Sequence, residues 1–125
     1  MYISKKFISA TKQYCTYVNH IPAPYLRRVF NISSDAKTAQ ITICGLGFYE
    51  LFINGKRITR GLISPYISNP DDIMFYDLYN IENLLQQGEN VIGVILGNGM
   101  QNSMGGTWDF DKAAWRSAPK LALCL

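Results

Sequence analysis

The stretch QITICGLGFYELFINGKRI, residues Gln40 to Ile58, decides the fold because apolar and polar side chains alternate along it between turns of glycine and asparagine. Side chains of a β-strand point alternately to two faces, so an alternating apolar set lies on one face. The two sets are Ala39, Ile41 and Ile43 before the turn at Gly45-Leu46-Gly47, and Tyr49, Leu51 and Ile53 after it. Asn54-Gly55 is the pair preferred in two-residue hairpin turns, where both residues need positive φ. The stretch predicts an antiparallel β-meander with one face in a core.

Further strands are predicted on both sides of this meander. They are Tyr25 to Ile32, Ile73 to Leu78, Asn90 to Leu96 and Lys120 to Leu125. The third is nearly all apolar, which predicts a central strand covered on both faces. Between strands, Asn80 to Leu85 has room for one helical turn, with Asn80 as its cap. Short strands, one brief helix and no repeated βα pattern predict an all-β protein, an antiparallel β-sandwich with jelly-roll connections.

The two ends of the chain differ in character. Residues 1–24 close with His20-Ile21-Pro22-Ala23-Pro24, whose prolines impose an extended backbone. We expect an extended lead-in over 1–24 and one sandwich domain over 25–125. Because the sequence stops within an apolar strand, we expect the domain to lack its last strand or strands. An unpaired edge there offers a site for self-association with another copy of the chain.

Composition bounds the partners and the compartment. The chain has 125 residues, is 48% hydrophobic and carries a net charge of +3 from scattered basic residues. No basic stripe favours nucleic acid, and no run of about 20 apolar residues favours a membrane span. Cys15, Cys44 and Cys124 form no CxxC pair and with His20 make no zinc spacing, which favours thiols packed as small hydrophobes. With no visible signal peptide, we expect a cytoplasmic protein without a cofactor.

The long connection Gly97 to Pro119 is the part richest in possible ligands, because connections longer than about 12 to 15 residues are usually functional or disordered. Aromatic faces suit the apolar side of a sugar ring, and amides and carboxylates suit its hydroxyls. The candidate carbohydrate-binding residues are Asn98, Gln101, Asn102, Trp108, Asp109 and Trp115, joined by Tyr66 from the loop after Pro65. Alternatively, Trp108, Phe110 and Trp115 only pin this loop onto the sandwich.

Asp109 and Asp111 are weak candidates for a calcium site. Calcium takes six to eight oxygen ligands, and two carboxylates do not define such a site. The alternative is that they cap turns or pair with Lys112 and Arg116. Spacing alone leaves open that they form a glycosidase pair, but no cleft pattern and no triad accompanies them. We therefore assign no catalytic residue and no metal.

From Ala23 to Leu125 the order of motifs resembles the N-terminal accessory domain of bacterial α-L-rhamnosidases, glycoside hydrolase family 78. The matching motifs are APYLRRVF at Ala23 to Phe30, GLGFYELFINGKRI at Gly45 to Ile58, Ser64 to Tyr66, DLYNIENLL at Asp77 to Leu85, and GENVIGVILGNG at Gly88 to Gly99. The resemblance implies a galactose-binding-like β-sandwich upstream of a helical catalytic domain that releases terminal α-L-rhamnose. In some relatives the sandwich itself recognises rhamnose through calcium. The family's catalytic carboxylates lie in the helical domain, so no residue here inherits a catalytic role.

One motif departs from the family pattern. Many relatives resemble GDGWYRG where this chain has GNGMQNS at Gly97 to Ser103, so Asn98 and Met100 replace an acidic and an aromatic residue. This weakens the case for sugar or calcium at that loop. Three hypotheses follow: an accessory domain that docks to the helical catalytic domain and helps shape its substrate site, a carbohydrate-binding module for rhamnose-containing glycans, and a small hydrolase in its own right.

Overall fold

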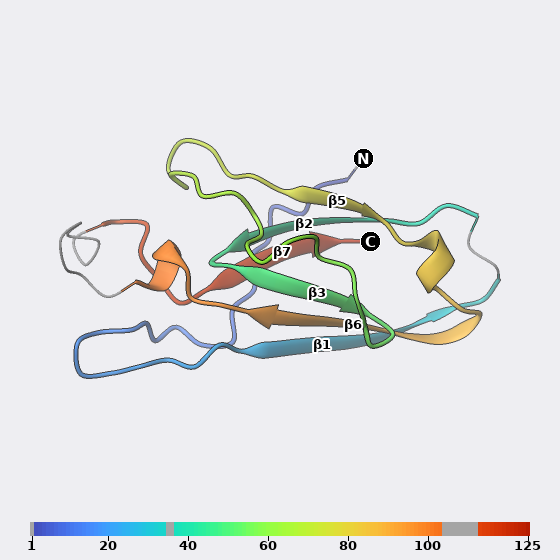
Figure 1. Cartoon of the computed structure of the whole chain (residues 1–125), viewed down its shortest axis with the longest axis horizontal. Helices are drawn as coiled ribbons and strands as arrows, with labels where there is room; N and C mark the ends of the chain where they lie inside the picture. Colours follow the sequence, from blue (N-terminus) through green and yellow to red (C-terminus); the bar gives the residue numbers. More distant parts are fainter. Residues whose placement is uncertain (1, 35–36, 104–112) are drawn as a thin grey trace.

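Two antiparallel sheets stack into a β-sandwich in the computed structural model, which describes residues 2–34, 37–103 and 113–125 (Figure 1). The strands are β1 (Tyr25–Ile32), β2 (Gln40–Leu46), β3 (Tyr49–Ile53), β4 (Lys56–Arg57), β5 (Asp77–Asn80), β6 (Gly88–Leu96) and β7 (Lys120–Cys124). One sheet has the order β1-β6-β3-β4 and the other β5-β2-β7. Two short 3-10 helices, η1 (Glu82–Leu84) and η2 (Met100–Asn102), complete the described elements. The predicted all-β antiparallel sandwich is confirmed.

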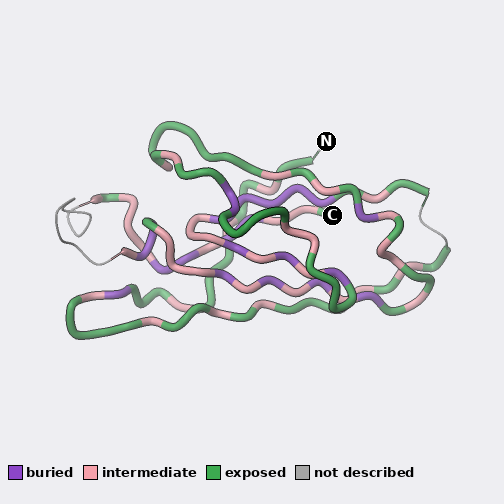
Figure 2. Tube along the Cα trace, viewed as in Figure 1, coloured by how far each residue is buried: buried purple, intermediate pink, exposed green. Residues whose placement is uncertain are grey.

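The core lies between the two sheets. Figure 2 shows buried positions alternating with less buried ones along the strands. The buried members of the core are Ile41 and Ile43 of β2, Tyr49, Leu51 and Ile53 of β3, Ile92, Val94 and Leu96 of β6, and Ile81 and Leu121. Because each strand turns every second side chain inward, the alternation read from the sequence fixes which residues form this core.

The predicted meander is wrong in one respect, because β2 does not pair with β3. β2 lies in the other sheet, between β5 and β7, and the turn after it carries the chain from one sheet to the other. Gly45 permits this crossover, since a Cβ there would lie 2.7 Å from Cδ1 of the Tyr49 ring. Gly47 has φ of 110° and sits against the carbonyl oxygen of Gly97. Two glycines therefore make a sheet-changing corner rather than a hairpin.

The second turn of the stretch is the expected hairpin. β3 and β4 pair antiparallel, and Ile53 faces Lys56 across the two-residue loop. Asn54 has φ of 50° and Gly55 φ of 80°, the positive values that this turn requires. The Asn54 side chain also accepts a hydrogen bond from the Val91 N–H (2.8 Å), which fastens the turn to β6.

β6 is central in its sheet, between β1 and β3, as predicted. It is buried on one face only, because Asn90, Ile92, Val94 and Leu96 are buried while the residues between them are half-buried. The expectation that both faces are covered is therefore wrong. Continuous hydrophobicity does not distinguish a doubly covered strand from one whose outer face carries apolar residues.

Two other elements differ from their predicted bounds. β5 starts at Asp77, so Ile73 to Tyr76 belong to the preceding loop and are exposed. The residue that caps η1 is Ile81, and it makes no side-chain hydrogen bond to the helix. The prediction that Asn80 caps this helix is therefore wrong. The Asn80 Oδ1 instead accepts a hydrogen bond from Gln40 Nε2 (2.9 Å), which joins β5 to β2.

Within residues 2–24 the described backbone forms one isolated bridge and otherwise no strand or helix. The bridge pairs Ile8 with Leu121 through reciprocal hydrogen bonds of 2.8 and 2.9 Å. Nearby, the Thr42 hydroxyl donates to the Tyr2 carbonyl (2.5 Å). The lead-in thus lies along the edge of β7 and the outer face of β2. The domain limit at residue 24 and self-association through an edge remain predictions. In the parts of the chain described, no helix is long and apolar enough to cross a bilayer.

Candidate functional site: a cavity beside the β2–β3 corner

A cavity of about 360 Å³ opens at one end of the sandwich, where the β2–β3 corner meets η2 and the loop before β5. Its lining residues are Gly45, Leu46, Gly47, Phe48, Pro65, Tyr66, Ile67, Ser68, Asn69, Pro70, Phe75, Met100, Gln101 and Trp115. The cavity brings together Tyr66, Gln101 and Trp115, which the sequence singled out for carbohydrate binding. None of these lining residues carries a charge, and their polar side chains are those of Tyr66, Ser68, Asn69, Gln101 and Trp115.

Gln101 connects η2 to the segment before β7. Its Nε2 donates to the Trp115 carbonyl (2.5 Å) and to the Ser117 hydroxyl (2.9 Å). The Ser117 N–H in turn donates to the Gln101 carbonyl (3.0 Å). The side chain is only 4% exposed, and its Oε1 has no hydrogen-bond partner among the residues described. A buried acceptor without a partner is costly, about 1–3 kcal/mol, and therefore calls for an explanation.

Asn98 and Asn102 lie next to this site but do not line the cavity. Asn102 Oδ1 accepts from the Cys15 N–H (2.6 Å), and Asn102 Nδ2 donates to Asn98 Oδ1 (2.8 Å). Asn98 Nδ2 donates to the Ile21 carbonyl (3.1 Å). Both amides are therefore paired within the protein, where they hold the lead-in against the loop after β6. This role was not predictable from local sequence, because Cys15 and Ile21 are distant in the chain.

Arg116 adds a second clamp on the lead-in. Its Nε donates to the Ser103 carbonyl (2.8 Å), its guanidinium also donates to the Cys15 carbonyl, and it lies 5.0 Å from the centre of the Tyr14 ring. Charge-assisted hydrogen bonds and a cation–π contact act together here. The described contacts give Arg116 a structural role that its suggested pairing with Asp111 did not include.

Trp108, Asp109 and Asp111, together with Phe110, lie outside the residues that the structure describes. Sugar contacts by Trp108 and Asp109, and calcium binding by the two aspartates, therefore remain predictions. Within the described ranges, no group of three or more His, Cys, Asp or Glu side chains is placed to hold a metal ion.

A polar link between the two sheets was not predicted from the sequence. The Tyr49 hydroxyl of β3 donates to Asp77 Oδ2 of β5 and lies 3.1 Å from the Tyr79 hydroxyl. Burial first, and the hydrogen bond to Asp77 second, raise the pKa of Tyr49 far above its usual value. Burial, helped by the charge of Asp77, also raises the pKa of the Cys44 thiol. These groups stay protonated at neutral pH, which suits a structural link and not a nucleophile. The sequence signal was the alternation of Asp77 and Tyr79 on one face of a strand.

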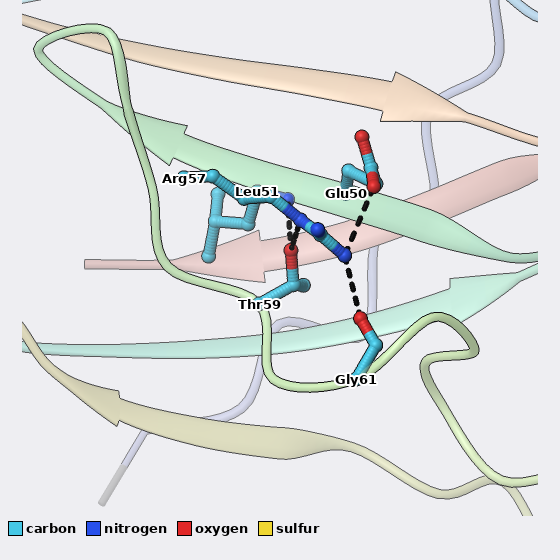
Figure 3. A network of polar contacts seen from close by, with 5 residues as sticks. All are labelled: Glu50, Leu51, Arg57, Thr59 and Gly61. Carbon is cyan, nitrogen blue, oxygen red and sulfur yellow. Dashed lines mark hydrogen bonds and ion pairs between the residues drawn. The ribbon is translucent and has the colours of Figure 1, made fainter.

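Figure 3 shows the network of polar contacts that joins the start of the loop after β4 to β3 and β4. Arg57 forms an ion pair with Glu50 (3.0 Å), and its guanidinium donates to Thr59 Oγ1 (3.3 Å) and to the Gly61 carbonyl (2.5 Å). The Leu51 N–H also donates to Thr59 Oγ1 (3.3 Å). The ion pair is exposed and contributes little stability by itself. The contacts of Arg57 and Thr59 hold the first residues of the loop after β4 against β3.

The loop that leaves this network exposes a large apolar surface. Its members are Leu62, Ile63, Tyr66, Ile67, Ile73, Met74 and Phe75, all at least 44% exposed, and we call them the apolar surface. Tyr66, Ile67 and Phe75 also line the cavity, so the apolar surface borders its opening. Large apolar side chains that gather on one exposed loop are candidates for contact with a partner.

Comparison with known proteins shows the family to which the domain belongs. Residues 34–125 match the family model described as the alpha-L-rhamnosidase N-terminal domain. An alpha-L-rhamnosidase of Formosa agariphila is 42% identical over 82 residues, which are 66% of this chain and 9% of that protein. A second alpha-L-rhamnosidase of the same organism is 28% identical over 102 residues, 80% of this chain and 11% of that protein.

Solved structures agree with the sequence comparisons. The alpha-L-rhamnosidase of Dictyoglumus thermophilum matches with a TM-score of 0.72 and 32% identity, over 97% of this chain and 13% of that one. The Streptomyces avermitilis alpha-L-rhamnosidase, complexed with L-rhamnose, shares the fold with a TM-score of 0.71 at 22% identity, over 82% of this chain and 10% of that one. The chain thus spans about a tenth of the length of these relatives. From the family match over residues 34–125, the chain belongs to the alpha-L-rhamnosidase N-terminal domain family.

Proposed function

We propose that this chain is a noncatalytic accessory domain of an α-L-rhamnosidase-like glycoside hydrolase, which docks to the helical catalytic domain and helps to shape its substrate site. The observation that carries the proposal is the apolar surface. Leu62 is 89% exposed and Tyr66 is 83% exposed, so large side chains face water on a single loop. Covering them removes apolar area from water, which is the main favourable contribution to most protein association.

The position of the apolar surface supports docking near a substrate. It borders the cavity, and the Tyr49 N–H donates to the Ser64 carbonyl (2.9 Å), which anchors the loop to β3. Ser64 and Pro65 are buried while their neighbours on both sides are exposed. A loop anchored at its middle presents its apolar side chains in a defined arrangement, so less ordering entropy is lost on docking.

The test measures binding between this chain and a helical rhamnosidase catalytic domain by isothermal titration calorimetry. Leu62→Ser removes an exposed apolar side chain that does not line the cavity, and we expect it to weaken binding about tenfold or more. Val18→Ser is the matched control, because Val18 is 97% exposed and lies in the lead-in. The control should bind within about twofold of the parent chain. Absence of binding by the unmodified chain, or equal losses in both variants, contradicts docking through the apolar surface.

A second candidate is a carbohydrate-binding module for rhamnose-containing glycans, and the cavity favours it. Tyr66 and Trp115 offer aromatic rings there, and Gln101 offers an amide. Titration of L-rhamnose into the labelled chain, followed by NMR, separates the candidates. Saturable shifts at these three residues, lost in Tyr66→Ala, support the module. Unchanged spectra at high sugar concentration oppose it.

A further inference from the structure

The cavity differs from a typical sugar site in the chemistry of its walls. Phe48, Pro65, Ile67, Pro70 and Phe75 supply rings and aliphatic groups, and no described lining residue is charged. The polar side chains in the lining are those of Tyr66, Ser68, Asn69, Gln101 and Trp115, and the Asn69 amide is already hydrogen-bonded to Asp72 and to the Asp71 N–H. Sites that select sugars place several fixed polar groups against the hydroxyls, and each hydroxyl left without a partner weakens binding. These walls suit a flat, mostly apolar group better than a pyranose with hydroxyls on both faces.

The side chain of Gln101 further restricts which ligand group fits the cavity. Gln101 lines the cavity and keeps both Nε2 contacts within the protein, while its Oε1 lacks a partner among the described residues. Since Gln101 lines the cavity, a ligand that enters it is able to supply the missing partner of Oε1 while Nε2 keeps its contacts with Trp115 and Ser117. An acceptor in this position selects a ligand that brings a hydrogen-bond donor.

The opening of the cavity indicates where such a ligand comes from. Tyr66, Ile67 and Phe75 belong both to the cavity wall and to the apolar surface, so a partner that covers the apolar surface also covers the opening. Binding energy at interfaces is concentrated in aromatic anchors that enter pockets near the centre of the contact. A cavity of about 360 Å³ has ample room for one such side chain.

We propose that the cavity is a socket for one tryptophan side chain of the docked catalytic domain, whose indole N–H donates to Gln101 Oε1. Tryptophan combines a large apolar surface with a single donor, which matches mostly apolar walls and an acceptor, Gln101 Oε1, that is buried without a partner among the described residues. The inference rests on the proposed docking function, and it names the anchor by which docking occurs.

Two isomeric probes test the socket in the 125-residue chain itself. 3-Methylindole is the tryptophan side chain with its N–H, whereas 1-methylindole has the same atoms but no donor. NMR titration should show both isomers shifting Ile67 and Met100, with 3-methylindole binding about tenfold more tightly. Gln101→Met, which keeps the length but removes the acceptor, should abolish the difference between the isomers. Ser117→Ala is the control, since it removes one Nε2 contact and leaves Oε1 in place.

The outcomes separate this inference from the docking proposal. Saturating 3-methylindole should weaken docking to the catalytic domain at least about tenfold. If docking persists unchanged in the presence of 3-methylindole, the socket proposal is wrong and the docking proposal stands. If the unmodified chain does not bind the catalytic domain at all, both proposals fail. Equal affinity for the two isomers in the unmodified chain overturns the role of Gln101, whether or not Gln101→Met folds. L-Rhamnose that displaces 3-methylindole assigns the cavity to a sugar and overturns the socket.

Discussion

Tyr49→Phe removes one oxygen atom from the link between the two sheets and leaves the ring in place. The lost hydroxyl donates to Asp77 and lies 3.1 Å from the Tyr79 hydroxyl, and Tyr49 itself is 3% exposed. A hydrogen bond to a charged group contributes about 1.5–3 kcal/mol, and Asp77 is partly exposed, so we expect a loss of about 1.5 kcal/mol in the free energy of unfolding at pH 7.

The same substitution changes how stability depends on pH. Burial and the hydrogen bond to Asp77 raise the pKa of Tyr49 in the folded protein far above the 10.0 of a free tyrosine, so the group's contribution to stability is complete below pH 10 and declines above it. Above that pH the unfolded chain has released the tyrosine proton while the folded chain retains it. Stability then falls by about 1.4 kcal/mol per pH unit for this one group. Tyr49→Phe lacks that contribution, so its stability should fall less steeply.

Urea unfolding followed by circular dichroism at pH 8, 9, 10 and 11 measures both effects. The curves of the parent chain and Tyr49→Phe should be separated by a constant amount up to about pH 9.5 and should converge by about 1 kcal/mol by pH 11. Tyr66→Phe is the control, because Tyr66 is 83% exposed and should leave the parent curve unchanged. Parallel curves for the parent chain and Tyr49→Phe up to pH 11 would refute the argument that burial and Asp77 keep Tyr49 protonated.

Three further substitutions or assays test other parts of the molecule. Gly47→Ala should lower the free energy of unfolding by about 2 kcal/mol or more, because φ at Gly47 is 110° and the neighbouring backbone occupies the space of a Cβ. Gly61→Ala should cost about 1 kcal/mol, because φ there is 74° but the space is open. Equal costs for the two variants would contradict the packing argument. Asn102→Ala leaves the Cys15 N–H without its acceptor, so limited proteolysis should cut the lead-in faster than in the parent chain. An unchanged rate of cleavage would show that the hydrogen bond between Asn102 and Cys15 is not needed to hold the lead-in. We expect no turnover of an aryl α-L-rhamnoside by this chain alone, because no described carboxylate lines the cavity, and turnover abolished by Asp109→Asn would contradict a noncatalytic role.

The strands and the hairpin were predictable because their signals are local. Alternation along β3 and the Asn54-Gly55 pair act within a few residues, and no distant partner is needed to interpret them. The assignment of β2 to the other sheet was not predictable in this way. A glycine-rich corner between two strands permits a hairpin or a crossover, and the choice depends on pairing with β5 and β7, which lie far along the chain.

The candidate site residues also separate into those predictable from residue type and those whose role depends on distant contacts. Tyr66, Gln101 and Trp115 were singled out by residue type, and the fold brings all three to one cavity. Asn98 and Asn102 have the same residue chemistry but face the lead-in, because their partners Cys15 and Ile21 come from the opposite end of the sequence. Residue type indicates what a side chain is able to bind, whereas distant contacts decide which of these side chains are already paired.

The bridge between Ile8 and Leu121 joins positions separated by almost the whole chain. Closing so long a loop costs entropy before any contact compensates for it, so we expect this pairing to form late, once both sheets have assembled. By the same reasoning it opens early under mild denaturant, and amide hydrogens of the lead-in should exchange with solvent well before those of β3 and β6. On this expectation the lead-in would detach while the core remains folded, and its departure would leave the backbone of Leu121 in β7 without the partner that Ile8 now provides.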